Sequence, residues 1–246
     1  MIAIFTDFGV QGPYLGQMRA VLLAQAPGVP VVDIFPDLPS FNVRAAAYLL
    51  PAYSQYLPDH SVSVCVVDPG VGSDRRALVV HADSRWYVGP DNGLFSILIR
   101  RASQVQVSEI TWRPEQLSNS FHGRDLFAPV AAAIARGEQP SAEAIDLNRL
   151  LIPNWPEDLM QVVYLDRYGN AITGFRSCAV RRDAILSVGR WRCEFRPTFA
   201  EADAGIPVWY ENSNGLLEIA LPGADAAAVL GLAVGSVFML DAGLYS

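Results

Sequence analysis

The chain has 246 residues, of which 51% are hydrophobic, so it can form one large domain or two smaller ones, each with a buried core. Its net charge is −7 and its basic residues are scattered, whereas nucleic acids and anionic membranes are bound by concentrated positive surfaces. All 18 basic residues are arginine, and the absence of lysine excludes Schiff-base chemistry, pyridoxal phosphate attachment and a phosphate-binding loop lysine.

The apolar runs and the first residues of the chain indicate the compartment. The longest apolar runs, such as 46–51 and 226–234, are much shorter than the roughly 20 residues of a bilayer span. The first residues lack the basic and then apolar character of a secretion signal. The cysteines at 65, 178 and 193 are widely spaced, so we interpret them as packing residues rather than zinc ligands or nucleophiles. We therefore expect a cytoplasmic protein with neither a membrane nor a nucleic-acid partner.

Strand-like and helix-like segments alternate in the first 150 residues, which is typical of an α/β domain with a largely parallel sheet. In chain order the predicted elements are strand 2–5, helix 14–25, strand 31–35, helix 43–56, strand 62–67, a hairpin of strands 77–81 and 85–88, helix 94–101, strand 105–110 and helix 126–136. We expect a Rossmann-like sheet domain over residues 1–152.

The pattern changes after a segment that contains Pro153 and Pro156, which predicts a domain boundary. Short strands with a period of two follow, at 161–165, 172–175, 185–188, 191–195, 208–210, 216–220 and 237–240, with a helical turn near 225–232. These strands predict a small second domain over residues 160–246, either a β-barrel or a β-sandwich.

Asp7 directly follows the first predicted strand, at the carboxyl end where open α/β sheets bind ligands. Its carboxylate could accept hydrogen bonds from a ribose diol, or it could cap a helix or brace a turn. No Gly-x-Gly-x-x-Gly pattern follows this strand, which argues against an ordinary dinucleotide-binding fold.

Asp68, Arg75 and His122 lie in two further loops, and binding and catalytic groups are disproportionately mounted on loops. Asp68 ends a buried strand, and Arg75 follows in a Gly-rich loop that can fold back towards it. This pair either belongs to a site or only staples the turn. His122 precedes Arg124 and Asp125, which could themselves be charges at a helix N-terminus.

Two loops of the second domain carry turn residues. Residues 166–170 read Asp-Arg-Tyr-Gly-Asn, and residues 212–215 read Asn-Ser-Asn-Gly. Hairpin turns contain Asp, Asn and Gly for conformational reasons alone, so the residue types by themselves predict turns and no chemistry.

Six motifs that occur in a fixed order resemble those of the S-adenosylmethionine hydroxide adenosyltransferases, which are hydrolytic relatives of fluorinating and chlorinating enzymes. They are Thr-Asp-Phe-Gly at 6–9, Val-Asp-Pro-Gly-Val-Gly at 67–72, Gly-Pro-Asp-Asn-Gly-Leu at 89–94, Phe-His-Gly-Arg-Asp-x-Phe-Ala-Pro-Val-Ala at 121–131, Asp-x-x-Gly-Asn at 166–170 and Asn-Ser-x-Gly at 212–215. The resemblance covers nearly the whole chain.

The resemblance implies an N-terminal α/β domain, a C-terminal β-barrel and a homotrimer with substrate sites between subunits. It implies a catalytic set of Asp68, Arg75 and His122. The substrate-binding residues that it implies are Asp7 for the ribose hydroxyls, Phe41 beside the ribose, Phe199 stacked on adenine, and Asp166, Asn170 and Ser213 for the methionine end and the base.

The implied reaction is hydrolysis of S-adenosylmethionine to adenosine and methionine, without a metal or an organic cofactor. Either Asp68 or His122 would take the proton of the attacking water, while Arg75 stabilises the nucleophile. The alternatives are a halogenase, whose known members differ at Asp68 and His122, and a non-catalytic nucleotide-binding module. The chain also departs from its relatives at Gly12, where an amine-binding aspartate is usual, and at Pro36, where a histidine is common.

Overall fold

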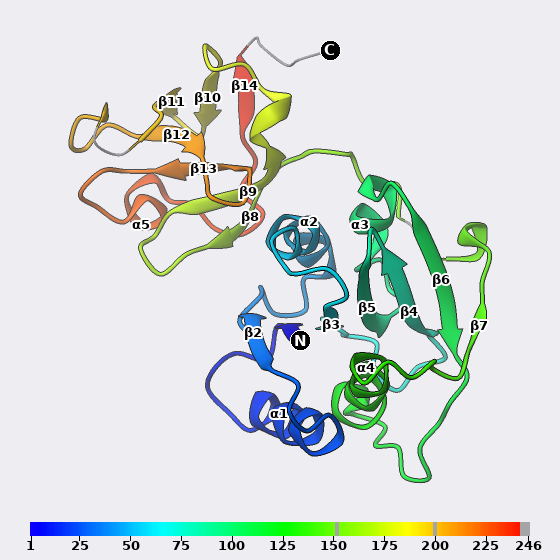
Figure 1. The fold of residues 1–246 in the computed structure, drawn as a ribbon. Helices are drawn as coiled ribbons and strands as arrows, with labels where there is room; N and C mark the ends of the chain where they lie inside the picture. The colour runs from blue at the N-terminus through cyan, green and yellow to red at the C-terminus, as the bar shows by residue number, and fades with distance from the viewer. Residues whose placement is uncertain (151–152, 199–200, 242–246) are drawn as a thin grey trace. The chain divides into compact units, whose positions relative to one another are not determined.

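The computed structural model describes residues 1–150, 153–198 and 201–241 (Figure 1). The chain divides into two compact units, Met1–Pro153 and Asn154–Ser246. Within the described residues, each unit contains one seven-stranded sheet.

The sheet of the first unit has the strand order β2-β1-β3-β5-β4-β6-β7. Its strands are β1 (Ile2–Thr6), β2 (Val31–Phe35), β3 (Val62–Val66), β4 (Ala77–Ala82), β5 (Arg85–Pro90), β6 (Val105–Ile110) and β7 (Ala142–Ala144). The predicted parallel arrangement is correct for β2, β1, β3 and β5. The predicted β4–β5 hairpin is also present, and through it β4, β6 and β7 extend the sheet with antiparallel pairs.

Helices cover both faces of this sheet: α1 (Tyr14–Gln25), α2 (Val43–Ser54), α3 (Ser96–Arg101) and α4 (Ala128–Ala135). α1 and α4 lie together on one face, and α2 and α3 lie on the other (Figure 1). Met18 and Leu22 of α1 pack with Ile4 and Val64 of the sheet in a hydrophobic core cluster of this unit. Such burial on both faces explains why the central parallel strands read as continuous apolar runs.

The sheet of the second unit has the order β14-β10-β11-β12-β13-β9-β8. Its elements are β8 (Leu159–Leu165), β9 (Ala171–Arg176), β10 (Ile185–Val188), β11 (Trp191–Phe195), β12 (Val208–Glu211), β13 (Leu216–Ala220), a short helix α5 (Ala226–Leu230) and β14 (Met239–Asp241).

This second sheet curls on itself. The Val162 amide of the edge strand β8 donates to Ser236 O at 2.9 Å, and the Gly235 amide donates to Val162 O at 2.8 Å. Residues 235–236 lead into β14, the opposite edge strand, so these bonds bring the two edges together around the core of Trp209, Leu217 and Ile219. The expected C-terminal β-barrel is therefore observed as a curled half-barrel, which reduces the length of unpaired sheet edge.

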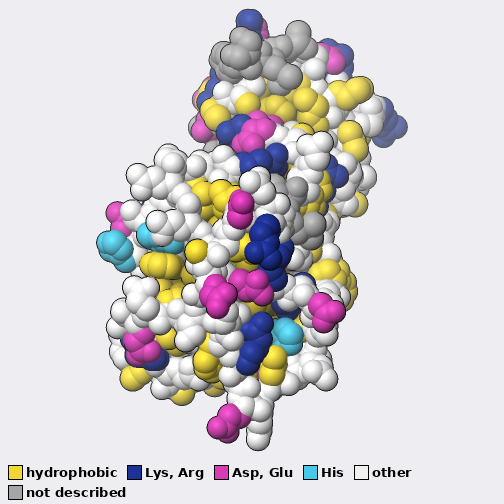
Figure 2. Space-filling model, turned by 90° about the vertical axis from the view of Figure 1, so that its right-hand side faces the viewer, with side chains coloured by type: hydrophobic (Ala, Val, Ile, Leu, Met, Phe, Trp, Pro, Cys, Tyr) yellow, Lys and Arg dark blue, Asp and Glu magenta, His cyan; other side chains and the backbone are white. Residues whose placement is uncertain are grey.

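Arginine and acidic side chains lie next to one another on the surface that Figure 2 shows. Ion pairs between arginine and aspartate in the described residues include Arg76–Asp91 at 2.9 Å and Arg181–Asp183 at 2.6 Å. None of the described helices combines the length and the apolar character that crossing a membrane requires.

Candidate active site

The candidate site of the first unit lies at the edge where its parallel strands end. Asp7 directly follows β1, Asp68 comes two residues after β3, and Asn92 comes two residues after β5. β4 runs in the opposite direction, so Arg75, two residues before its start, reaches the same edge. Four polar side chains that are distant in the sequence thus arrive at one edge of the sheet, where open α/β sheets bind ligands.

The strand order explains why the 67–76 loop folds back on itself. β5 lies between β3 and β4, so the loop must cross two strand spacings, or about 10 Å, above the end of β5. The Asn92 side-chain amide, just after β5, donates to Val67 O at 2.8 Å and so fixes the start of the loop to the end of β5. The Ser73 hydroxyl donates to Gly70 O at 2.7 Å and closes its tip.

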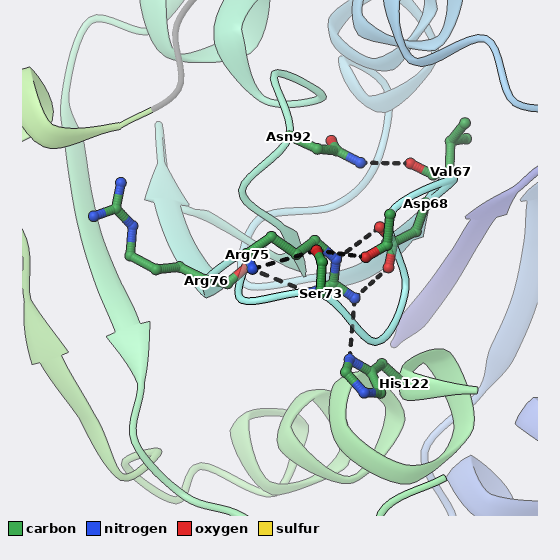
Figure 3. A network of polar contacts seen from close by, with 8 residues as sticks. Val67, Asp68, Ser73, Arg75, Arg76, Asn92 and His122 are labelled. Carbon is green, nitrogen blue, oxygen red and sulfur yellow. Dashed lines mark hydrogen bonds and ion pairs between the residues drawn. The ribbon is translucent and has the colours of Figure 1, made fainter. Parts of the chain in front are cut away.

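Arg75 connects Asp68 and His122 through one guanidinium group (Figure 3). Its Nε donates to Asp68 Oδ1 at 2.7 Å, and its Nη2 donates to Asp68 Oδ2. The same Nη2 lies 3.1 Å from His122 Nδ1. The side chains of Arg75 and Asp68 are only 7% and 4% exposed, so this charged pair is shielded from water and holds a fixed geometry.

These contacts also determine the protonation of His122. An arginine guanidinium has only donors, so the contact is a hydrogen bond only if His122 Nδ1 carries no proton. A neutral ring then carries its proton on Nε2. Consistently, burial and the nearby Arg75 charge hold the pKa of His122 below its ordinary value of 6.5. We therefore infer that the site holds an anion, a cation and a neutral imidazole whose Nε2–H is a donor.

The segment around His122 is held by a tight local structure. A π-helical turn, Gly123–Phe127, begins directly after His122 and leads into α4; such turns are frequent at functional sites. Asp125 does not act as a free helix charge, because it accepts the Ser118 amide hydrogen at 3.0 Å and pairs with Arg124. Phe127 packs below the Arg75 guanidinium, with 5.3 Å between the ring centroid and Cζ.

Gly72 allows the 67–76 loop and the loop before His122 to approach each other. Its φ is +84°, and an added Cβ would lie 2.5 Å from Asn119 O in the loop before His122. Only glycine avoids both the backbone strain and this clash. The Gly-rich sequence at 70–72 thus serves the contact between the Arg75 loop and the His122 loop.

A cavity of about 310 Å³ opens beside this network and is lined by Asp7, Phe41, Asp68 and His122 among others. Asp7 Oδ2 accepts the backbone amide hydrogen of Phe41 at 2.8 Å, although 34 residues separate the two. Burial raises the pKa of Asp7 from 3.8. Phe41 has a φ of 60° and is 76% exposed, so its ring stands at the mouth of the cavity rather than in the core.

The remaining predicted site residues belong to the second unit. Asp166 Oδ1 accepts the amide hydrogens of Tyr168 and Asn170, each at 2.8 Å, and Asp166 Oδ2 accepts from Asn170 Nδ2 at 3.0 Å. Asp166 and Asn170 therefore form one braced turn between β8 and β9. Ser213 lies exposed in a different turn, between β12 and β13. Phe199 lies outside the described residues.

The structure adds residues to which the sequence reasoning gave no role. Asn92 lies within the 89–94 motif, which could have marked it as a candidate site residue. Its contact with Val67, however, depends on β5 lying beside β3 in the sheet. Phe8, Tyr14 and Phe121 line the cavity and pack in tilted and edge-to-face pairs, with ring centroids 5.4 to 5.9 Å apart. Across the described part of the chain, no group of three His, Cys, Asp or Glu side chains is placed to hold a metal ion.

Comparison with known proteins gives consistent results for both units. Residues 2–144 match the SAM hydroxide adenosyltransferase N-terminal domain and residues 160–238 match the SAM hydroxide adenosyltransferase C-terminal domain. The chain is 40% identical to an (R)-S-adenosyl-L-methionine hydrolase of Thermus thermophilus, over 95% of this chain and 96% of that protein. It is 23% identical to a fluorinase of Actinopolyspora mzabensis, over 92% of each.

A solved structure has the same fold. An uncharacterised conserved protein from Thermotoga maritima superposes with a TM-score of 0.88 at 28% identity, covering 98% of this chain and all of that chain.

Proposed function

The chain belongs to the SAM hydroxide adenosyltransferase family, and from this premise we propose that it hydrolyses S-adenosyl-L-methionine to adenosine and L-methionine. The observation that carries the proposal is the contact of Asp68 and His122 with a single guanidinium, that of Arg75, beside a cavity large enough for part of a nucleoside. A module that only bound the nucleotide would have no use for a shielded anion and imidazole at this position.

The reaction needs little from the protein because the leaving group is already activated. A water oxygen attacks C5′ of the ribose, the C5′–S bond breaks, and its electron pair stays on sulfur, which leaves as neutral methionine. The protein must hold the water in line with the breaking bond and keep other solvent away. One proton is released for each substrate consumed.

We assign the proton-accepting role to Asp68 and the orienting role to His122. In the protonation state inferred from the Arg75 contact the His122 Nε2–H is a donor, so the ring can hold the water oxygen but cannot take its proton. The oxygen becomes strongly acidic only as the C–O bond forms, so a carboxylate is a sufficient base at that moment. Arg75 fixes Asp68 and stabilises negative charge on the nucleophile. At about 4 Å this attraction is worth roughly 4 kcal/mol before desolvation, at an effective dielectric of about 20.

The substrate-binding residues follow from the same proposal. Asp7 would accept hydrogen bonds from the ribose diol, and the exposed Phe41 ring would cover the ribose. Asp166, Asn170 and Ser213 would hold the methionine end and the base, and Phe199 would stack on adenine. Gly12 supplies no carboxylate, so the Asp166 carboxylate is the group that we assign to the substrate's ammonium.

We further propose a cytoplasmic homotrimer in which a neighbouring subunit completes each substrate site, and a reaction without a metal, an organic cofactor or a nucleic-acid partner. The exposure of Phe41 at the cavity mouth supports the need for a covering partner. Light scattering would measure the mass. Mixing subunits that carry Arg75→Ala with subunits that carry Asn170→Ala should restore activity if sites combine residues from two subunits, and should give none if each site is built from one chain.

The decisive assay incubates the purified protein with S-adenosylmethionine, with and without chloride or fluoride, and separates the products by chromatography. Adenosine and methionine in equal amounts support hydrolysis. A 5′-halo-adenosine that forms only with added halide would identify a halogenase, and unchanged but bound substrate would identify a sensor. Arg75→Ala should form no product while the dissociation constant of the substrate stays within about tenfold; equal loss of binding and turnover would contradict the proposed role.

The relative from Thermus thermophilus is named for the (R) form of the substrate. We extend this preference to the present chain. Inversion at sulfur moves the methyl and methionyl groups while C5′ stays in place, so a site that holds both the ribose and the methionine end can distinguish the two epimers. Initial rates with the separated (R) and (S) epimers test it, and equal rates would exclude it.

A further inference from the structure

A buried carboxylate of the second unit takes no part in the proposed reaction. Glu218 lies in the middle of β13, directly opposite Tyr210 of β12 and next to Ile172 of β9. Its neighbours Leu217 and Ile219 point into the core cluster, so alternation along the strand directs Glu218 to the other face of the sheet. Even there it is only 5% exposed.

Two neutral groups hold this carboxylate. The Tyr210 hydroxyl donates to Oε1, and Asn212 Nδ2 donates to Oε2 at 3.1 Å. Among the described residues, the groups that act on its charge are these two donors and the Asp166 carboxylate. Burial and Asp166 both raise the pKa of Glu218. Burying an acidic group in such a place costs stability. Its presence therefore indicates that its hydrogen bonds serve another purpose.

The Asn212 side chain, which donates to Glu218, also accepts hydrogen bonds from the turn between β12 and β13. Its Oδ1 accepts the amide hydrogens of Asn214 and Leu216, each at 3.0 Å, and so defines the loop that surrounds Ser213. Because Oδ1 is engaged in this way, the amide cannot rotate to present its oxygen to Glu218. The orientation of Asn212, and with it the turn, depends on having an acceptor at position 218.

We propose that Glu218 is a positioning residue, whose carboxylate fixes the Asn212 amide and thereby the turn that presents Ser213 to the substrate. This inference rests on the proposed function only in assigning Ser213 to the substrate. Glu218 acts through the turn, so it governs substrate binding and leaves unaffected the chemical step that we assign to Asp68, Arg75 and His122.

The test exchanges the donor and the acceptor. Asn212→Asp places two carboxylates against each other, so at about pH 8 the KM should rise about tenfold while kcat stays within about twofold. Adding Glu218→Gln should restore the KM, because the new amide donates to the aspartate, and the Tyr210 hydroxyl donates to the amide oxygen. Glu218→Gln alone should change the KM less than about threefold, since its amide can turn its oxygen to Asn212 and its NH₂ to Tyr210.

The matched control is Asn212→Asp combined with Glu211→Gln, which has the same net charge as the rescued double variant. Glu211 neighbours Asn212 but makes an exposed ion pair with Arg182 at 2.6 Å. This control should keep the raised KM. Equal rescue by both double variants would show that net charge matters and geometry does not, which would overturn the proposal.

Hydrogen exchange at the Asn214 and Leu216 amides provides a readout that needs no substrate. Exchange should accelerate in Asn212→Asp and return to the wild-type rate with Glu218→Gln added; unchanged exchange in the single variant would overturn the proposal. If Asn212→Asp does not fold, Asn212→Ala replaces it, with no rescue expected from Glu218→Gln. A wild-type protein that neither binds nor converts S-adenosylmethionine would refute the proposed function, and the exchange pattern would still decide the role of Glu218.

Discussion

Asp7 and Phe41 are joined by a hydrogen bond from the Phe41 amide to the Asp7 carboxylate, which ties the end of β1 to the start of α2. Asp7 Oδ2 is therefore committed to the protein, and Oδ1 is the oxygen that we propose for the ligand. Asp7→Asn can keep the bond to Phe41 but presents an NH₂ group to the ribose. We expect its KM to rise about tenfold, with its stability within about 1 kcal/mol of the wild type.

Asp7→Ala provides the comparison, because it removes both interactions. It should raise the KM at least as far and also destabilise the first unit by about 1–2 kcal/mol. Thermal unfolding and steady-state kinetics on the two variants separate the contributions. If Asp7→Asn were as unstable as Asp7→Ala, the ribose assignment would lose its support.

The pKa of His122 predicts the acid limb of the activity. Because burial and Arg75 lower this pKa, the ring stays neutral at neutral pH and takes up a proton only as the pH falls below about 6.5. A proton on Nδ1 would face the Arg75 guanidinium and break the network. We expect kcat/KM to fall with an apparent pKa below 6.5, measured in a series of buffers at constant ionic strength.

The same shift has a defined sign for stability. The unfolded chain binds a proton at a higher pH than the folded one, so the His122 contribution to stability is lost between the unfolded and the folded pKa as the pH falls.

Asp7 also has a raised pKa, so Asp7→Asn serves as the control for the acid limb of the activity. An acid limb that disappears in Asp7→Asn would assign it to Asp7 and contradict the assignment to His122.

Arg75→Lys tests whether the shape of the guanidinium matters beyond its charge. A lysine ammonium cannot bind both oxygens of Asp68 while it also donates to His122. We expect kcat to drop by about 100-fold with the KM changed less than about threefold. Arg181→Lys, which alters an exposed pair with Asp183, should leave both constants unchanged. Wild-type kcat in Arg75→Lys would show that charge alone suffices.

Gly72→Ala and Gly137→Ala form a matched pair, because the two glycines have nearly the same φ, +84° and +85°. An added Cβ at Gly137 meets open space, whereas at Gly72 it lies 2.5 Å from Asn119 O. Gly137→Ala should therefore cost only about 1 kcal/mol of backbone strain. Gly72→Ala should cost more and should also lower kcat, because it pushes the Arg75 loop away from His122. Equal effects on unfolding and on kcat would show that the two loops are not in the tight contact described.

Much of the fold could be predicted because the local patterns were clear. The strand limits 105–110, 185–188, 191–195 and 216–220 are those observed, since alternation and turn residues marked both ends of each strand. β7 was missed because the three residues Ala-Glu-Ala carry no strand signal and are held only by pairing with β6. Helix α3 begins at Ser96 rather than 94, because Gly93 and its neighbours form a turn after β5.

The candidate site was predicted only in part. The motifs placed Asp68, Arg75 and His122 together, and their contacts agree with this. The roles of Asn92 and Gly72 could not be predicted. Asn92 depends on β5 lying between β3 and β4, and Gly72 depends on the contact of its loop with Asn119; no local pattern encodes either tertiary arrangement. The π-helical turn Gly123–Phe127 was not predicted: residues 123–125 were placed in the loop before a helix over 126–136, since the wider hydrogen bonding of the turn is set by packing and not by residue type.

The single guanidinium that serves both partners has a consequence for how substitutions combine. Removing either Asp68 or His122 frees Arg75 to shift, so each loss also disturbs the contact that formally remains. Penalties in log rate for the two sites should then fall well short of additive, with the double replacement little worse than the more damaging single one. We therefore expect the trio to act as one functional unit, in which each side chain contributes fully only while the other two are present.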